Sequence, residues 1–397
     1  MATANSISDI TPPPAPAGAE LLVQVAAMPP DQLEILLSRL SETFAADRLL
    51  IAVPDAAAEL RSTLRTVTIP AAKSTWTLTA ADFVNSAELA RKHEARAILM
   101  LGPESASLTS TSLHDLAGAV LTTTATTDLA VPLYQLPPHA GLVNSAILYP
   151  LTRALFAQRM RFPLAIDLGL SVRMADRLAA VGQRYSAASQ GEAIVWPVNE
   201  AAVAGYVIHE VEVGPRSLPQ PIEFDLNAVL ALVTGSLFAD VDSKAAFWQR
   251  ARALPPPRTP VPQPPLTEAA ADIAPMLDSF RLAYTNLREI WSLVLPPNSL
   301  LGLKRLSVTD AATFRMPDNL WTRIVYDFLL AYRLRTINRG HLLGALTPLY
   351  LAWVASHINI TASGTNPERH IEAVAAAFEA DKPYLVSRWR WPDRFNP

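Results

Sequence analysis

The chain has 397 residues, more than one globular core usually holds, so we expect two domains. Half of the residues are hydrophobic and 17% are charged, which excludes a globally disordered chain. The formal net charge of −3 lacks the basic excess that nucleic acids or anionic membranes attract, so neither is expected as a partner. Cysteine is absent, which excludes disulfides, thiolate metal sites and cysteine nucleophiles.

Targeting signals are not evident. Residues 1–12 are small and polar, without the basic start and apolar core of a signal peptide. The most apolar late stretch, residues 342–354, is shorter than the roughly 20 apolar residues that span a bilayer. We therefore predict a cytoplasmic protein without a membrane span.

The N-terminal half of the chain alternates between strands and helices. Residues 1–19 form a Pro/Ala-rich leader that we expect to be flexible, and a domain over residues 20–253 follows. Strands are predicted at 21–27, 49–53, 97–101, 129–134 and 206–213, and helices at 31–44, 81–95, 112–121 and 144–160. Continuous apolar strands between helices indicate a parallel sheet that helices cover on both faces.

A proline-rich linker is predicted at residues 254–266, which contain seven prolines. Residues 267–397 then show helical periodicity alone, for example Trp321, Ile324, Val325, Phe328 and Leu329 on one face. The predicted fold class is therefore an α/β domain followed by an all-helical C-terminal domain. We interpret the tryptophans on apolar faces as core residues, not as sugar-stacking platforms; they are Trp196, Trp291, Trp321 and Trp353.

Generic catalytic and phosphate-binding motifs are missing. The sequence contains no G-x-G-x-x-G, no P-loop, no H-E-x-x-H and no G-x-S-x-G. The seven histidines are scattered, and none pairs with another at i+3 or i+4 as a helical metal site requires. Local motifs alone therefore do not define a reaction.

Two longer segments carry a family resemblance. Residues 142–156, LVNSAILYPLTRALF, and residues 161–171, RFPLAIDLGLS, resemble a conserved block of GT-A glycosyltransferases of the glucosylglycerate and mannosylglycerate synthase type. The late segments WTRIVYDF, HLLGALTPLYL and KPYLVSRW resemble the helical appendage of the same enzymes. The resemblance covers most of residues 20–397 and implies a GT-A, Rossmann-like domain.

The resemblance implies a retaining glycosyltransferase that moves a hexose from a nucleotide diphosphate sugar to a small polar acceptor such as glycerate. Such enzymes usually use Mg²⁺ or Mn²⁺ to neutralise the diphosphate. The nucleotide would lie at the carboxyl ends of the strands at 21–27 and 49–53. Asp55 matches the family's nucleotide-binding aspartate, and Glu104 replaces the second aspartate of the metal-binding D-x-D motif.

The metal site of the family is depleted in this sequence. Gly102 stands where the first aspartate belongs, and no histidine occurs near Gly214, so Glu104 alone would hold metal weakly. Two interpretations remain open for Arg216, which either replaces the metal as the positive charge or marks a site that has decayed. Asp167 matches the family's "DxGxS" segment; it contacts donor sugar in one interpretation and caps a loop in the other.

Four more residues are candidates for substrate binding. His139 would lie on a lid loop above the donor, or serve as ordinary turn material. Asn144 opens the resembling helix, and Arg153 and Arg161 flank it. The two arginines suit a phosphate or carboxylate acceptor, although surface solvation would also explain them.

Two functions are therefore carried forward. The first is a glycosyltransferase with a nucleotide sugar and a small acceptor as its partners, and with Asp167 and Arg216 as catalytic residues. The second is a catalytically inactive GT-A-like binding or regulatory protein. Homo-oligomerisation is left open, and the sequence does not identify the sugar, the base or the acceptor.

Overall fold

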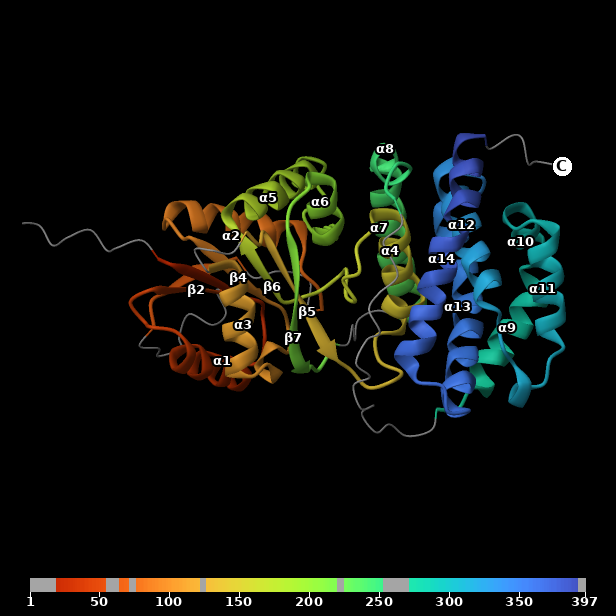
Figure 1. The fold of residues 1–397 in the computed structure, drawn as a ribbon, viewed down its shortest axis with the longest axis horizontal. Coiled ribbons are helices and arrows are strands. Elements are labelled where there is room, and N and C mark those ends of the chain that lie inside the picture. The colour runs from red at the N-terminus through yellow and green to blue at the C-terminus, as the bar shows by residue number, and fades with distance from the viewer. Residues whose placement is uncertain are drawn as a thin grey trace, which may run out of the picture.

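The computed structural model describes residues 19–54, 64–70, 76–121, 126–219, 225–252 and 271–391. In these ranges a seven-stranded sheet forms one half of the molecule, and a layer of helices forms the other (Figure 1). Residues 1–18 of the leader, the proline-rich linker and Asp55 lie outside the described residues. The predicted fold class, α/β followed by an all-helical region, is confirmed.

The sheet is mixed, and its strand order is β3-β2-β1-β4-β6-β5-β7. The strands are β1 (Leu21–Val25), β2 (Leu49–Pro54), β3 (Thr66–Ile69), β4 (Ala97–Leu101), β5 (Leu129–Gln135), β6 (Leu168–Ser171) and β7 (Ile208–Pro215). Strand β6 runs antiparallel to both of its neighbours, β4 and β5, and all other pairs are parallel. The expectation of a purely parallel sheet was therefore wrong at β6.

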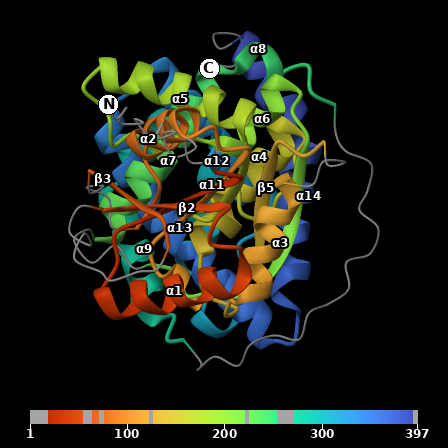
Figure 2. The same cartoon turned by 90° about the vertical axis from the view of Figure 1, so that its left-hand side faces the viewer.

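Helices cover both faces of this sheet. One face carries α2 (Ala80–Lys92), α5 (Val172–Ala187) and α6 (Pro197–Ala204), and the other carries α1 (Pro30–Thr43) and α3 (Ser110–Leu121). Figure 2, viewed from the sheet side, shows β2 between α1 and α2. Leu33, Leu36, Leu37 and Leu40 form the buried face of α1, as their spacing predicts.

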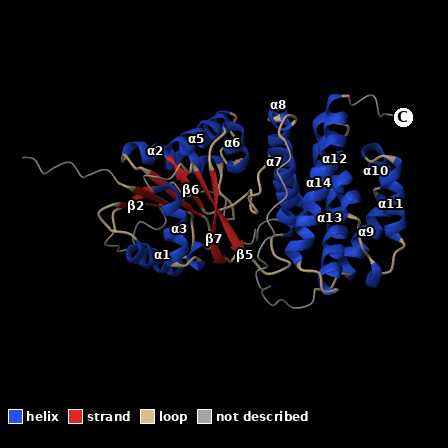
Figure 3. Cartoon of the chain, in the orientation of Figure 1, coloured by secondary structure: helices blue, strands red, loops and turns tan. Residues whose placement is uncertain are grey.

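The second half of the molecule is helical and begins before the predicted linker. It contains a π-turn at Asn144–Leu148, α4 (Tyr149–Phe156), α7 (Leu226–Ser243), α8 (Ala245–Trp248), α9 (Ala274–Asn286), α10 (Arg288–Val294), α11 (Pro297–Ser307), α12 (Asp318–Leu334), α13 (Arg339–Ala362) and α14 (Pro367–Arg390). Figure 3 shows no strand among these helices within the described ranges. The predicted helix over 144–160 therefore starts as a π-turn, and it ends at Phe156 because Ala157 adopts a left-handed conformation.

One hydrophobic core joins helices from both sides of the linker. It includes Phe156, Phe238 and Trp248 together with Phe328 and Trp389. The four tryptophans interpreted as core residues are at most 1% exposed. Helix α7 is the one described helix that is long and apolar enough to span a membrane, with a mean hydropathy of 1.3 and 44% of its residues buried; it packs against α12 and α13.

Candidate functional site

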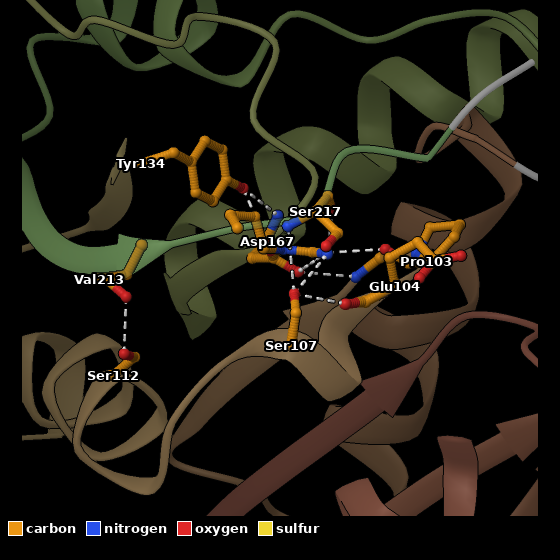
Figure 4. Close-up of polar contacts among 10 residues, drawn as sticks. Pro103, Glu104, Ser107, Ser112, Tyr134, Asp167, Val213 and Ser217 are labelled. Atoms are coloured by element: carbon orange, nitrogen blue, oxygen red, sulfur yellow. Dashed lines mark hydrogen bonds and ion pairs between the residues drawn. The ribbon is translucent and has the colours of Figure 1, made fainter. Parts of the chain in front are cut away.

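Three chain segments meet at one edge of the sheet (Figure 4). Gly102 directly follows β4, and Arg216 directly follows β7. Asp167 directly precedes β6, and because β6 runs in the opposite direction its first residue lies at the edge where β4 and β7 end. The strand directions therefore bring together residues that are 49 and 65 positions apart in the sequence.

Asp167 and Arg216 form a buried ion pair at this edge. The Nε and Nη2 atoms of Arg216 donate to the two carboxylate oxygens of Asp167, at 2.8 and 3.2 Å. Both side chains are 0% exposed. Although burial opposes its charged form, the carboxylate of Asp167 keeps the pKa of Arg216 above its ordinary value.

The other donors of Arg216 are also occupied. Nη2 donates to the carbonyl of Pro103 at 2.7 Å, and Nη1 donates to Ser107 Oγ at 3.2 Å and to the carbonyl of Ser217 at 2.6 Å. A guanidinium has five N–H groups, and Arg216 makes five hydrogen bonds. The hydrogen bonds of Nη1 are partly buried, whereas those of Nε and Nη2 are buried, so a ligand would approach the guanidinium from the Nη1 side and displace those partners.

Asp167 is fixed by two further donors. The backbone N–H of Gly102 donates to its Oδ1 at 3.1 Å, and the hydroxyl of Tyr134 donates to its Oδ2 at 2.8 Å. Burial and the neighbouring Asp167 charge raise the pKa of Tyr134 well above its ordinary value, so this hydroxyl stays protonated and remains a donor. Tyr134 was not predicted as a site residue, because it reads as an ordinary aromatic residue of strand β5.

The residues at this edge do not fit a divalent cation. A Cβ atom at Gly102 would lie 2.8 Å from Ile166, so the position of the first D-x-D aspartate has no room for a side chain. Both oxygens of Asp167 are already held by Arg216. Glu104 adopts a left-handed conformation at φ 62°, and its charge acts on Arg216. Among the described residues, no group of three metal-ligating side chains occurs.

Asn144 and Arg161, both predicted to bind substrate, lie side by side away from this edge. The Nδ2 atom of Asn144 donates to the carbonyl of Arg161 at 2.8 Å. Arg161 forms a bidentate ion pair with Glu368 of α14: its Nε and Nη2 atoms donate to the two carboxylate oxygens at 2.9 and 3.1 Å. Nη2 also donates to Ser145 Oγ at 3.0 Å. In this structure Arg161 therefore holds the segment before β6 against the helical layer.

Arg153 has a similar role on α4. It donates to Glu372 at 2.6 Å and to Glu379 at 2.9 Å, both on α14, and its side chain is 3% exposed. The hydroxyl of Tyr149 donates to Glu372 as well, at 2.5 Å. The arginine contacts are ion pairs between α4 and α14, so surface solvation does not explain Arg153.

His139 lies against a pair of buried histidines. Its ring meets the ring of His357 edge-on with the centroids 6.2 Å apart, and its Nε2 lies 3.4 Å from Thr361 Oγ1. His357 on α13 and His370 on α14 contact each other through their Nδ1 atoms at 2.7 Å. This pair was not predicted, because a histidine pair is recognisable in a sequence when its members lie one helical turn apart, and these two lie on different helices.

An aromatic contact links the two groups of residues. The rings of Tyr134 and Phe162 lie 5.0 Å apart, and the guanidinium of Arg161 lies 5.0 Å from the Phe162 ring centroid. Tyr134 also donates to Asp167, and Arg161 also donates to Glu368. The sheet edge and the helical layer are thus coupled through a continuous set of packed side chains.

Comparison with solved structures finds distant similarity. No family model and no curated protein matches this chain. A glucosyl-3-phosphoglycerate synthase from Mycobacterium tuberculosis in complex with phosphoglyceric acid has 13% sequence identity and a TM-score of 0.35, over 56% of this chain and 79% of that chain. The same synthase with Mn²⁺, UDP-glucose and phosphoglyceric acid has 14% identity and a TM-score of 0.37, over 58% and 81%. Likenesses at this level assign neither ligand nor activity to the present chain.

Proposed function

We propose that this chain is a GT-A-type nucleotide-sugar glycosyltransferase whose donor site carries an arginine in place of a divalent cation. The observation that carries the proposal is the position of Arg216. It is a buried cation at the edge where six of the seven strands end, which is where open α/β sheets bind their ligands. The resemblance of residues 142–171 to GT-A enzymes supports the same assignment.

The geometry suggests how Arg216 would bind a diphosphate. Asp167 holds the buried Nε and Nη2 side, and this contact fixes the direction of the guanidinium. On the Nη1 side the partners are a serine hydroxyl and a carbonyl, both uncharged. A phosphate oxygen that replaces them would pair the guanidinium cation with an anion, which is a stronger contact than its present hydrogen bonds to uncharged acceptors. No step of this binding requires a metal ion.

A second function is favoured by a specific observation. All five N–H groups of Arg216 and both oxygens of Asp167 are satisfied inside the protein. A fully satisfied ion pair is also what a catalytically inactive GT-A-like protein would retain as a structural element. In that case the chain would bind a partner or regulate an active relative.

Calorimetric titration with nucleoside diphosphates and their sugars, in the presence of EDTA, tests the proposal. We expect at least one to bind, and Arg216→Lys to bind it at least tenfold more weakly, because lysine keeps the charge but not the planar geometry. Arg91→Gln is the control, since Arg91 is exposed and pairs with the exposed Asp176. Binding that appears only with Mn²⁺, or no binding in the whole panel, contradicts the proposal. Binding without sugar transfer favours the inactive protein.

A further inference from the structure

We propose that His357, His370 and Asp318 form a pH-sensitive clasp that holds the loop around His139 against helices α12, α13 and α14. The clasp is defined by these three residues, one from each helix. None of the three stands in a segment for which the sequence predicts a role in binding or catalysis, and the proposal is independent of any sugar transfer. It rests on a contact between two ring nitrogens in the interior of the protein.

The contact between the two imidazoles restricts how many protons the pair can hold. Their Nδ1 atoms are 2.7 Å apart, so one must donate and the other must accept. Asp318 Oδ1 lies 3.3 Å from Nε2 of His370, and a carboxylate there favours a proton on that nitrogen. If both rings carried two protons, an N–H group on each Nδ1 would face the other across this contact, so the pair cannot hold two added protons.

The surroundings of His357 reinforce this restriction. His357 is 0% exposed, and the indole of Trp353 stacks on both imidazoles, with interplanar angles of 13° and 14°. Burial, together with the charges of His370 and His139, lowers the pKa of His357 to about 3. The folded clasp therefore keeps His357 neutral at a pH where a free histidine is charged.

The charged groups around the clasp come from every element packed on it. Asp318 is on α12, Glu368 and His370 are on α14, and His139 is on the loop before the π-turn. Arg161, on the segment before β6, adds a positive charge that disfavours protonation of His357, although it is paired with Glu368. Asp318 and Glu368 are the two acidic groups among these described residues. Asp318 is paired with His370, and Glu368 is paired with Arg161.

The consequence for stability has a definite sign. His357 has a lower pKa in the folded state than in an opened state, where it returns to about 6.5. His357 therefore binds a proton in the opened state but stays neutral in the folded state. The folded state loses stability relative to the opened state as the pH falls below about 6.5. The equilibrium shifts toward the opened state by up to about tenfold for each pH unit between 6 and 4. Opening would release the loop that His139 holds to Thr361.

Hydrogen exchange of the full chain at pH 7.5 and pH 5, corrected for intrinsic rates, tests the clasp. We expect peptides spanning residues 136–145 and 353–372 to lose protection at least tenfold at pH 5. His357→Asn should remove this pH dependence, whereas His341→Asn should keep it, because His341 is exposed on the same helix. A His357→Asn protein that keeps the wild-type pH dependence overturns the proposal.

A second measurement covers the case in which His357→Asn does not fold. NMR titration of the wild-type protein, labelled at its seven histidines, reports each ring directly. We expect one histidine to stay neutral until below pH 4, and its signal to be unaffected in His341→Asn. If all seven histidines titrate near their ordinary midpoint, the clasp does not exist as described.

Discussion

The ion pair at the sheet edge and the histidine clasp are two buried centres that differ in the charges of their members. At the sheet edge, Arg216 and Asp167 carry complementary charges, and each hydrogen-bonding atom of the pair has a partner. In the clasp, His357 and His370 are two groups that each bind a proton, and their contact has room for one hydrogen between them. The first contact therefore joins opposite charges, whereas the second is a contact that added protons oppose.

The difference follows from which elements supply the residues. The sheet edge is built at the ends of β4, β6 and β7, whose positions are fixed by ladder hydrogen bonds. The clasp is built between α12, α13 and α14, which are held together by side-chain packing and by side-chain ion pairs such as Arg388–Asp327, without a backbone ladder. A centre between packed helices can open locally without breaking a sheet, so it is the better place for a response to pH.

Of the predicted substitutions, removal of Arg216 should have the largest effect on the free energy of unfolding. Arg216→Met leaves the carboxylate of Asp167 buried without its counter-ion, so the free energy of unfolding should fall by about 3–5 kcal/mol in urea denaturation. The double variant Arg216→Met with Asp167→Leu removes both charges and should recover most of this loss. A double variant as unstable as the single one would show that the pair does not act as an ion pair.

Five strands and most helices of the α/β half were predictable, because four of the strands are nearly continuous apolar runs, β7 alternates between polar and apolar residues, and the helices have apolar residues at helical spacing. Strands β3 and β6 were not, since each has four residues, which is too short for its alternation to stand out. The direction of β6 depends on how the chain crosses the helical layer, and no local pattern records this. Without that direction, the convergence of Asp167 with Gly102 and Arg216 could not be derived.

In the candidate site, too, the sequence identified single residues but not the contacts between residues that are distant along the chain. The family resemblance named Asp167 and Arg216 separately, but it gave no reason to expect that they bind each other. Ser107 and Tyr134 were missed because neither stands in a motif. His357 and His370 are 13 positions apart on different helices, so their contact is a product of tertiary packing.

Glu210 on β7 offers a test with the opposite sign to the clasp. Burial raises the pKa of Glu210 to about 7, although the backbone N–H of Arg161 donates to its carboxylate. The folded state binds this proton more tightly than the unfolded state, so stability is lost as the pH rises from about 4.5 to 7. Glu210→Gln should therefore be more stable than wild type by up to about 2 kcal/mol at pH 8, and equal to it near pH 4.5.

Chemical denaturation of both proteins at the two pH values measures this effect. Glu34→Gln, at an exposed position of α1, is the control for the substitution itself. If Glu210→Gln were less stable than wild type at pH 8, the carboxylate would be charged and favourably held in the folded state. The interpretation of Glu210 would then be wrong.

The smallest expected effect is at Ser107, and it separates the structural role of Arg216 from a role in binding. Ser107 Oγ accepts from Arg216 Nη1 at 3.2 Å and from the backbone N–H of Ser217 at 3.4 Å (Figure 4). Ser107→Ala should lower the free energy of unfolding by about 1 kcal/mol, the usual net value of a hydrogen bond. It also leaves an Nη1 donor without its serine partner, so diphosphate affinity in EDTA should stay equal or rise. Ser112→Ala is the control, because Ser112 donates to Val213 and not to Arg216. A fall in affinity with Ser107→Ala alone would mean that the hydroxyl, and not Arg216, meets the phosphate.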